Sequence, residues 1–271
     1  MPARPDLAAA HLRGTLEAER FVEGVPRSVT ASVLDLFPSP SRETGIETQL
    51  LRGEHFTVYE TRDDGLAWGQ ADLDGYVGYV DAAGLSPRQP AETHVRALWS
   101  HVYSEPDIKS KPLAELPFMA RIPVAGTKGA FARLRDGGWV PRRHVEGAPG
   151  DFVAQAERFL GVPYLWGGRS ARGLDCSGIV QLALAAAGVA APRDTDMQED
   201  ALGRALAEDA PLERGDLIFW RDHVAIATAH DTMIHANAHD MAVALEPVKS
   251  AVLRIERAGG GPVTARLRLD G

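Results

Sequence analysis

The chain is poor in the features that mark secreted, membrane-spanning and nucleic-acid-binding proteins. It has one cysteine, Cys176, in 271 residues, which excludes an internal disulfide and so the disulfide-rich scaffolds of small secreted proteins. It has no apolar run of about 18 residues, the length of a transmembrane helix, and charges interrupt the N-terminal stretch where a signal peptide would be apolar. It has no Lys/Arg-rich run, and its net charge is −8, which disfavours a phosphate backbone as a partner. We therefore expect a cytoplasmic protein with no membrane and no nucleic-acid partner.

The residues that are present indicate several domains, because 271 residues exceed one ordinary hydrophobic core. Residues 1–24 are Ala-rich, and apolar residues between Leu7 and Val22 recur at helical spacing, which predicts a short helix or an extended arm. Residues 25–88 contain short alternating runs separated by Asp-Gly turns, which is typical of a small antiparallel barrel or sandwich. Residues 89–146 repeat this pattern weakly, and residues 147–150 are the predicted linker.

Residues 147–271 begin with helical patterns and end with strand patterns. Asp151 is the predicted N-cap of a helix that runs to Leu160, and two further helices are predicted from Cys176 to Gly188 and from Asp194 to Ala207. Strands are predicted at residues 216–220, 223–228, 232–237, 243–245, 253–255 and 263–269. Helices followed by antiparallel strands indicate an α+β fold.

Cys176 is the candidate nucleophile. It follows a glycine-containing loop and precedes a run of small apolar residues, so it is expected in the first turn of a helix. Unpaired backbone N–H groups and the helix dipole favour a thiolate at that position. The alternative is a buried, inert cysteine, because free cysteines are among the most buried residues.

Two histidines are candidate partners for this thiol. His223 begins one predicted strand and His235 lies in the next, so a hairpin would bring them side by side. A cysteine peptidase needs a thiol, a His that acts first as base and then as acid, and a polar group that orients the imidazole. The alternatives are structural histidines, or a metal site formed by His230, His235, His239 and Asp240, although the HExxH spacing of catalytic zinc sites is absent.

Four motifs in this order resemble those of the NlpC/P60 family of cysteine peptidases. They are PYLWGGRSARGLDCSG at residues 163–178, RGDLIF at residues 214–219, HVAI at residues 223–226 and IHAN at residues 234–237. The resemblance covers about residues 150–246, and the two N-terminal β patterns loosely resemble bacterial SH3 (SH3b) domains. The resemblance implies SH3b barrels at residues 25–88 and 89–146, which follow the predicted helix or arm at residues 1–24. It implies a papain-like catalytic domain at residues 147–271, in which helices pack on an antiparallel sheet.

The resemblance also implies roles for single residues. Cys176 matches the nucleophile of the family, His223 its general base and His235 its orienting residue. Tyr164 matches a tyrosine whose hydroxyl lies beside the nucleophile and serves the oxyanion, and the backbone N–H of Cys176 is a second candidate donor. Ser177 matches a position that lines the substrate pocket.

Specificity is implied for Asp194 and for the first SH3b domain. Asp194 resembles an acid that holds the free α-amine of an N-terminal L-Ala through a charge-assisted contact, and it is also a possible helix N-cap. In this branch of the family the first SH3b domain supplies an acid and a tyrosine to the pocket. The candidates are Glu47 or Glu54 and Tyr76 or Tyr79, of which we select Glu47 and Tyr76. A surface glutamate and a core tyrosine are the alternatives.

The predicted function is hydrolysis of the γ-D-glutamyl–diamino acid bond in cell-wall peptides by a thiol protease that needs no metal and no cofactor. The expected substrates are free muropeptides that begin with L-Ala, as in peptidoglycan recycling, with either meso-diaminopimelate or Lys as the diamino acid. The alternatives are a wall-peptide-binding module with an inactive catalytic domain, and a Cys–His amidase or acyltransferase that acts on another substrate.

Overall fold

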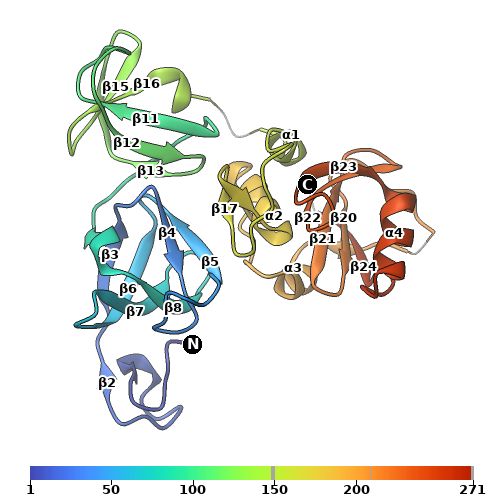
Figure 1. Cartoon of the computed structure of the whole chain (residues 1–271), viewed down its shortest axis with the longest axis horizontal. Coiled ribbons are helices and arrows are strands. Elements are labelled where there is room, and N and C mark those ends of the chain that lie inside the picture. The colour runs from blue at the N-terminus through green and yellow to red at the C-terminus, as the bar shows by residue number, and fades with distance from the viewer. Residues whose placement is uncertain (148–149, 208, 270–271) are drawn as a thin grey trace. The chain divides into compact units, whose positions relative to one another are not determined.

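A computed structural model describes residues 1–147, 150–207 and 209–269. The chain divides into an N-terminal unit, residues 1–147, and a C-terminal unit, residues 148–271; Figure 1 shows the elements of each. The two units contain separate hydrophobic clusters and are considered one at a time. The linker predicted at residues 147–150 includes residues 148 and 149, which lie outside the described residues.

The N-terminal segment is extended and packs on residues of its unit that include Leu66, Trp68 and Tyr79. It contains β1 (Ala8–Ala9), the 3₁₀ turn η1 (Ala10–Leu12) and β2 (Phe21–Val22), and β1 pairs with β2 in parallel. Leu7 is buried in a cluster with Trp68 and Tyr79. The Arg4 guanidinium lies 4.4 Å from the centroid of the Trp68 ring and donates a 2.9 Å hydrogen bond to the hydroxyl of Tyr79. Of the two alternatives predicted for this segment, the structure shows the extended arm and not the helix, because Leu7, Ala8 and Ala9 are buried in succession and not along one helix face.

The first β module, residues 25–87, contains a five-stranded antiparallel sheet of order β8-β7-β6-β3-β9 and a two-stranded sheet, β4-β5. Its elements are β3 (Val25–Val29), β4 (Val33–Leu36), β5 (Thr48–Leu51), β6 (His55–Thr61), β7 (Leu66–Ala71), β8 (Val77–Asp81), η2 (Ala82–Gly84) and β9 (Leu85–Pro87). The core contains the fully buried side chains of Leu36, Phe56 and Val80. The alternating runs predicted here are thus antiparallel strands around one core.

The second β module, residues 93–144, has a sheet of order β12-β11-β16-β15-β14 and the pair β10-β13. Its elements are β10 (Thr93–His94), β11 (Trp99–Tyr103), β12 (Pro112–Pro117), β13 (Arg121–Ile122), β14 (Val124–Lys128), β15 (Phe131–Leu134), β16 (Trp139–Pro141) and η3 (Arg142–His144). The sequence pattern did not predict β12. This strand lies at the edge of its sheet and its first residues are exposed, so it lacks a buried apolar stripe.

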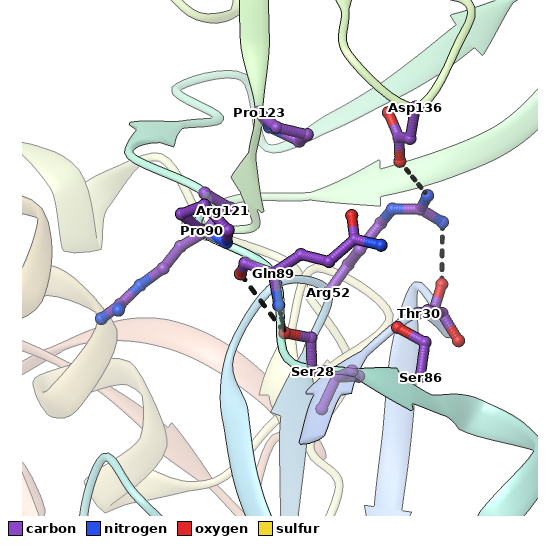
Figure 2. A pocket seen from close by; sticks show the side chains of 12 residues that line it. Ser28, Thr30, Arg52, Ser86, Gln89, Pro90, Arg121, Pro123 and Asp136 are labelled. Atoms are coloured by element: carbon purple, nitrogen blue, oxygen red, sulfur yellow. Dashed lines mark hydrogen bonds and ion pairs between the residues drawn. The ribbon is translucent and has the colours of Figure 1, made fainter. Parts of the chain in front are cut away.

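Figure 2 shows a small pocket, about 50 Å³ in volume, where the two β modules meet. Arg52 donates a 2.7 Å hydrogen bond to the carbonyl of Thr30 in the first module, and its other terminal nitrogen lies 3.5 Å from the carboxylate of Asp136 in the second. Ser28 also accepts a 2.9 Å hydrogen bond from the backbone N–H of Gln89. The pocket contains neither cysteine nor histidine, and we interpret it as the joint between the modules.

The C-terminal unit is built on one six-stranded antiparallel sheet of order β19-β24-β20-β21-β22-β23. Its strands are β17 (Arg169–Ser170), β18 (Gly173–Leu174), β19 (Arg204–Ala205), β20 (Leu217–Trp220), β21 (His223–Ala227), β22 (Thr232–Asn237), β23 (Ala242–Pro247) and β24 (Ala265–Arg268). Its helices are α1 (Phe152–Glu157), α2 (Cys176–Ala186), α3 (Thr195–Ala201) and α4 (Val248–Arg257). Helix α2 packs against β21 and β22, and α4 against β23, with α2 and α4 on opposite sides of the sheet (Figure 1).

The helix starts were predicted better than the ends. Asp151 caps α1, as predicted, by accepting hydrogen bonds from the backbone N–H groups of Val153 and Ala154. Helix α3 ends at Ala201 and not at Ala207, since the chain turns extended to form β19. Residues 253–255 were predicted as a strand, which is wrong because they belong to α4. The apolar residues of α4, Val248, Ala251, Val252 and Ile255, follow a helical period and cover the sheet.

None of the helices in the described part of the chain has the length and apolar character needed to span a membrane.

Candidate active site

Cys176 occupies the first turn of α2, as predicted. Asp175 is the N-cap and accepts a 2.7 Å hydrogen bond from the backbone N–H of Gly178 through Oδ1. Its second oxygen accepts a 2.8 Å hydrogen bond from the N–H of Gly167, which has a positive φ of 74°. A Cβ added at Gly178 would collide with the carbonyl oxygen of Gly168. The glycines therefore allow the preceding loop to lie directly against the start of the helix that carries the thiol.

Arg193 holds this helix start from the other side. Its guanidinium makes a two-pronged contact with Asp175, at 2.9 Å to Oδ1 and 2.6 Å to Oδ2, and donates a further 2.9 Å hydrogen bond to the hydroxyl of Ser177. The Arg193 side chain is 2% exposed and that of Asp175 10% exposed. Sequence reasoning missed Arg193, because a single arginine in a loop carries no signal of its partner 18 residues away.

The thiol of Cys176 is buried. Its Sγ lies 3.8 Å from the hydroxyl of Thr195 and 3.9 Å from the carbonyl oxygen of Asp222. Burial raises the pKa of the Cys176 thiol and the neighbouring Asp175 charge raises it further, whereas hydrogen bonds from Thr195 and the backbone of Val224 oppose this. The thiolate expected from the helix dipole alone is therefore not the favoured state of this structure.

His223 and His235 lie side by side, as the predicted hairpin requires. A two-residue turn joins β20 to β21, so that His223 begins β21 directly after Asp222. Strand β22 pairs with β21, and the Nε2 atom of His223 lies 2.8 Å from the Nδ1 atom of His235. Nδ1 of His223 is therefore the ring nitrogen left to exchange a proton with a substrate or the thiol.

Both imidazoles are neutral near pH 7. Burial, together with smaller effects of His235 and Arg254, lowers the pKa of His223 to about 3. Burial also lowers the pKa of His235 to about 4, which Glu246 partly opposes. A neutral imidazole and a protonated thiol form a pair in which the base takes the proton as the sulfur attacks.

Glu246 and Arg254 extend the histidine pair, and sequence reasoning missed both. The Nε2 atom of His235 lies 3.3 Å from a carboxylate oxygen of Glu246, without meeting the geometry of a full hydrogen bond. Arg254 donates two hydrogen bonds to the same carboxylate, of 3.1 and 2.6 Å. The helical period of residues 248–255 was the available signal, because it would have placed Arg254 on α4 facing the end of β23.

Tyr164 lies in the loop ahead of the thiol. Its backbone pairs with Leu174 in an isolated bridge and donates to the carbonyl of Met241. Burial, with a smaller effect of the nearby Cys176, raises the pKa of Tyr164 to about 12. The phenol therefore stays protonated at neutral pH and is able to donate a hydrogen bond.

Asp194 and Ser177 flank Arg193 and the thiol helix. Asp194 is half-buried at the N-cap position of α3, but its side chain makes no capping hydrogen bond. Ser177 is 5% exposed, and its hydroxyl accepts from Arg193. The capping alternative for the Asp194 side chain is thus not what the structure shows.

Glu47 and Tyr76 belong to the first β module, and their part in the site stays a prediction. Both are half-buried, with Tyr76 packed against the module core. The alternatives to them have structural contacts. Glu54 is 6% exposed and accepts a 2.9 Å hydrogen bond from the backbone N–H of Leu51, while the Tyr79 hydroxyl accepts from Arg4.

The histidine-rich stretch after β21 does not gather around one point. His230 is exposed, whereas the two ring nitrogens of His235 face His223 and Glu246. Among residues 1–147, 150–207 and 209–269, no three His, Cys, Asp or Glu side chains are close enough to hold a metal ion.

Known proteins match both parts of the chain. The NlpC/P60 family model matches residues 161–256, and the model of the bacterial dipeptidyl-peptidase SH3 domain matches residues 36–85. The γ-D-glutamyl-L-lysine dipeptidyl-peptidase of Bacillus cereus is 26% identical over 249 residues, which cover 79% of this chain and 74% of that protein. The peptidoglycan endopeptidase RipB of Mycobacterium tuberculosis is 33% identical over 149 residues, which cover 49% of this chain and 58% of that protein.

The fold is shared with a solved structure. A crystal structure of an NlpC/P60 family protein from Bacillus cereus has a TM-score of 0.75 with this chain at 20% identity, and the match covers 90% of this chain and 99% of that one. The matched motifs, the shared fold and the relatives that are peptidases agree. Residues 161–256 are thus an NlpC/P60 domain and residues 36–85 a bacterial SH3 domain, and the chain is a cysteine-type peptidase.

Proposed function

We propose that this peptidase hydrolyses the γ-D-glutamyl–diamino acid bond of cell-wall peptides and that its substrates are free muropeptides beginning with L-Ala. The observation that carries the proposal is the hydrogen-bonded pair of His223 and His235 in the domain that also holds the only thiol of the chain. The choice of bond is supported by relatives from Bacillus cereus and Bacillus subtilis, both named γ-D-glutamyl-L-lysine dipeptidyl-peptidase. The Bacillus subtilis protein is 29% identical over 217 residues, 72% of its length.

The proposed reaction begins with Cys176. Its sulfur forms a bond to the carbonyl carbon of γ-D-Glu while Nδ1 of His223 takes the thiol proton, and the carbonyl π electrons move to the oxygen. The oxyanion accepts hydrogen bonds from the Tyr164 hydroxyl and the backbone N–H of Cys176. The C–N bond then breaks, and His223 gives its proton to the leaving amine of the diamino acid. Water, deprotonated by His223, then attacks the thioester carbonyl. The C–S bond breaks, the sulfur takes the proton back from His223, and the L-Ala-γ-D-Glu dipeptide is released. His235 orients the ring of His223 throughout.

Recognition of the free amine is assigned to Asp194. It is half-buried at the start of α3, and a carboxylate binds an ammonium group through a charge-assisted contact. Ser177 is the proposed neighbour in this pocket, and Glu47 and Tyr76 are the residues proposed from the first β module. We also propose that the second β module is a second SH3b domain, on the basis of its five-stranded antiparallel sheet.

The proposed setting is peptidoglycan recycling in the cytoplasm, where released peptides with free amines would be the substrates. A free thiol nucleophile suits a reducing compartment. Cell fractionation with activity assays would test this, and activity confined to the envelope fraction would contradict it.

The decisive experiment is mass-spectrometric product analysis on L-Ala-γ-D-Glu-Lys and L-Ala-γ-D-Glu-meso-diaminopimelate peptides, each with a free and with an acetylated N-terminus. We expect L-Ala-γ-D-Glu and the free diamino acid from the wild-type protein, and no product from Cys176→Ala or His223→Ala. Acetylation should reduce turnover, and Asp194→Asn should remove most of the difference between free and acetylated peptides. Release of a different bond, or full activity in Cys176→Ala, would overturn the proposal.

A further inference from the structure

The histidine pair leaves one question of proton placement open. A carboxylate that orients a catalytic imidazole accepts only, whereas a neutral imidazole donates from one nitrogen and accepts at the other. The 2.8 Å contact between Nε2 of His223 and Nδ1 of His235 is therefore compatible with two arrangements of protons. Only the arrangement with the proton on Nε2 of His223 leaves the Nδ1 lone pair that a general base needs.

The carboxylate of Glu246 lies on the side of His235 that faces away from His223. The His235 side chain is fully buried, and its Nε2 atom lies 3.3 Å from the carboxylate of Glu246 and has no other hydrogen-bond partner among the described residues. Side chains at alternate positions of a strand share a face. Because Glu246 pairs with Met233 and Ala244 pairs with His235, Glu246 is the diagonal neighbour of the imidazole on the face that α4 covers.

Arg254 keeps Glu246 ionised and in place. Its two hydrogen bonds come from α4 and occupy both carboxylate oxygens, and the Arg254 guanidinium lowers the pKa of Glu246. Glu246 therefore only accepts hydrogen bonds. A lone pair on Nε2 of His235 would face a negative charge inside the protein, whereas an N–H would be attracted to it.

We infer that Glu246, held by Arg254, is the positioning residue that sets the tautomers of both catalytic histidines. The carboxylate places a proton on Nε2 of His235, so that Nδ1 of His235 accepts. Nε2 of His223 must then carry the donated proton, and Nδ1 of His223 presents the lone pair that takes the proton of Cys176. The charged and titratable groups that act on this series of hydrogen bonds are Glu246, Arg254, Asp240 and the two histidines themselves.

The inference rests on the proposed use of His223 as a base and not on the choice of muropeptide. Its first test is therefore substrate-free NMR of the whole chain labelled with ¹⁵N-histidine. At neutral pH we expect a protonated Nε2 and an unprotonated Nδ1 for both His223 and His235. The opposite tautomer in the wild-type protein would overturn the inference directly.

Glu246→Gln is the sharpest variant. Its amide removes the negative charge that attracts a proton to Nε2 of His235, so the arrangement that places the proton on Nδ1 of His223 becomes populated. The corresponding loss of the correct tautomer in serine proteases costs about 10⁴-fold in kcat. Here one more imidazole intervenes, and we expect about a 100-fold lower kcat with KM within about twofold.

Glu256→Gln removes the same charge from an exposed position of α4 and is the matched control, expected to retain wild-type kcat. If Glu246→Gln keeps wild-type kcat and tautomers, or loses activity with unchanged tautomers, Glu246 is a structural residue and the inference fails. If the wild-type protein shows the expected tautomers but cleaves none of the muropeptides, the substrate proposal fails while the positioning role stands.

Discussion

Replacing Arg193 with Met tests how the start of the helix that carries Cys176 is held. The substitution keeps an unbranched side chain of similar length but leaves the Asp175 carboxylate, whose side chain is 10% exposed, without the guanidinium that contacts both of its oxygens. Two backbone N–H donors, from Gly167 and Gly178, remain. Breaking one side of a buried ion pair costs about 3–5 kcal/mol because it strands a charge. We expect a loss of this size for Arg193→Met.

The matched control is Arg214→Met in the same C-terminal unit. Arg214 also contacts two carboxylates, those of Asp151 and Glu157, but its side chain is 40% exposed, and exposed pairs contribute about 0–1 kcal/mol. Hydrogen–deuterium exchange of the α2 peptide measures both effects in the intact chain, and 3–5 kcal/mol corresponds to roughly 10²- to 4 × 10³-fold faster exchange. Asp175→Asn added to Arg193→Met should recover part of the loss, because it removes the stranded charge. Equal effects of the two arginine variants, or no recovery in the double variant, would refute the reasoning.

Three further predictions follow from the pKa values. His223 and His235 have pKa values of about 3 and 4 in the fold, against about 6.5 when unfolded. Between these values the unfolded chain therefore binds more protons than the folded one. The unfolding free energy should be greatest above about pH 6.5 and fall toward pH 3, by at most about 1.4 kcal/mol per pH unit per histidine. Urea unfolding at a series of pH values measures this, and an unfolding free energy that does not change over this range would contradict it. Because burial raises the pKa of Cys176, its alkylation by iodoacetamide should still be rising at the pH where an ordinary thiol levels off, and a plateau near pH 6 would oppose this. Because the pKa of Tyr164 is about 12, Tyr164→Phe should remove a hydrogen-bond donor and lower kcat by about 100-fold with little change in KM, which steady-state kinetics would show.

The local features of the active site were predictable because they depend on neighbours in the chain. The small apolar run after Cys176 and the N-cap at Asp175 specify where α2 begins. Two short apolar strands, separated by the turn at residues 228–231, specify the hairpin that brings His223 to His235. In the N-terminal unit, alternating runs separated by Asp-Gly turns predicted the strands but not β12, whose apolar face is incomplete.

The expectations that failed concern segments whose apolar residues fit both a helix and an extended conformation. Helical spacing at residues 7–22 did not produce a helix, because burying Leu7 beside Trp68 in the first β module outweighs the weak preference of a short segment for helix. Residues 253–255, Leu-Arg-Ile, alternate apolar and charged side chains, which suits a strand in isolation. The wider window from Val248 to Ile255 has the helical period, and packing on the sheet stabilises α4.

By itself the sequence determined the chemical groups and their order, from Tyr164 and Cys176 to His223 and His235, because reactivity belongs to residue types and short-range structure follows from neighbouring residues. Only the tertiary structure decided the ion pair of Arg193 with Asp175, the contact of Glu246 with His235, and the protonation states of the thiol and the imidazoles. The physical reason is that burial and charge–charge interactions depend on distance in space. The partners that set them come from separate helices, strands and loops, which meet only when the chain is folded.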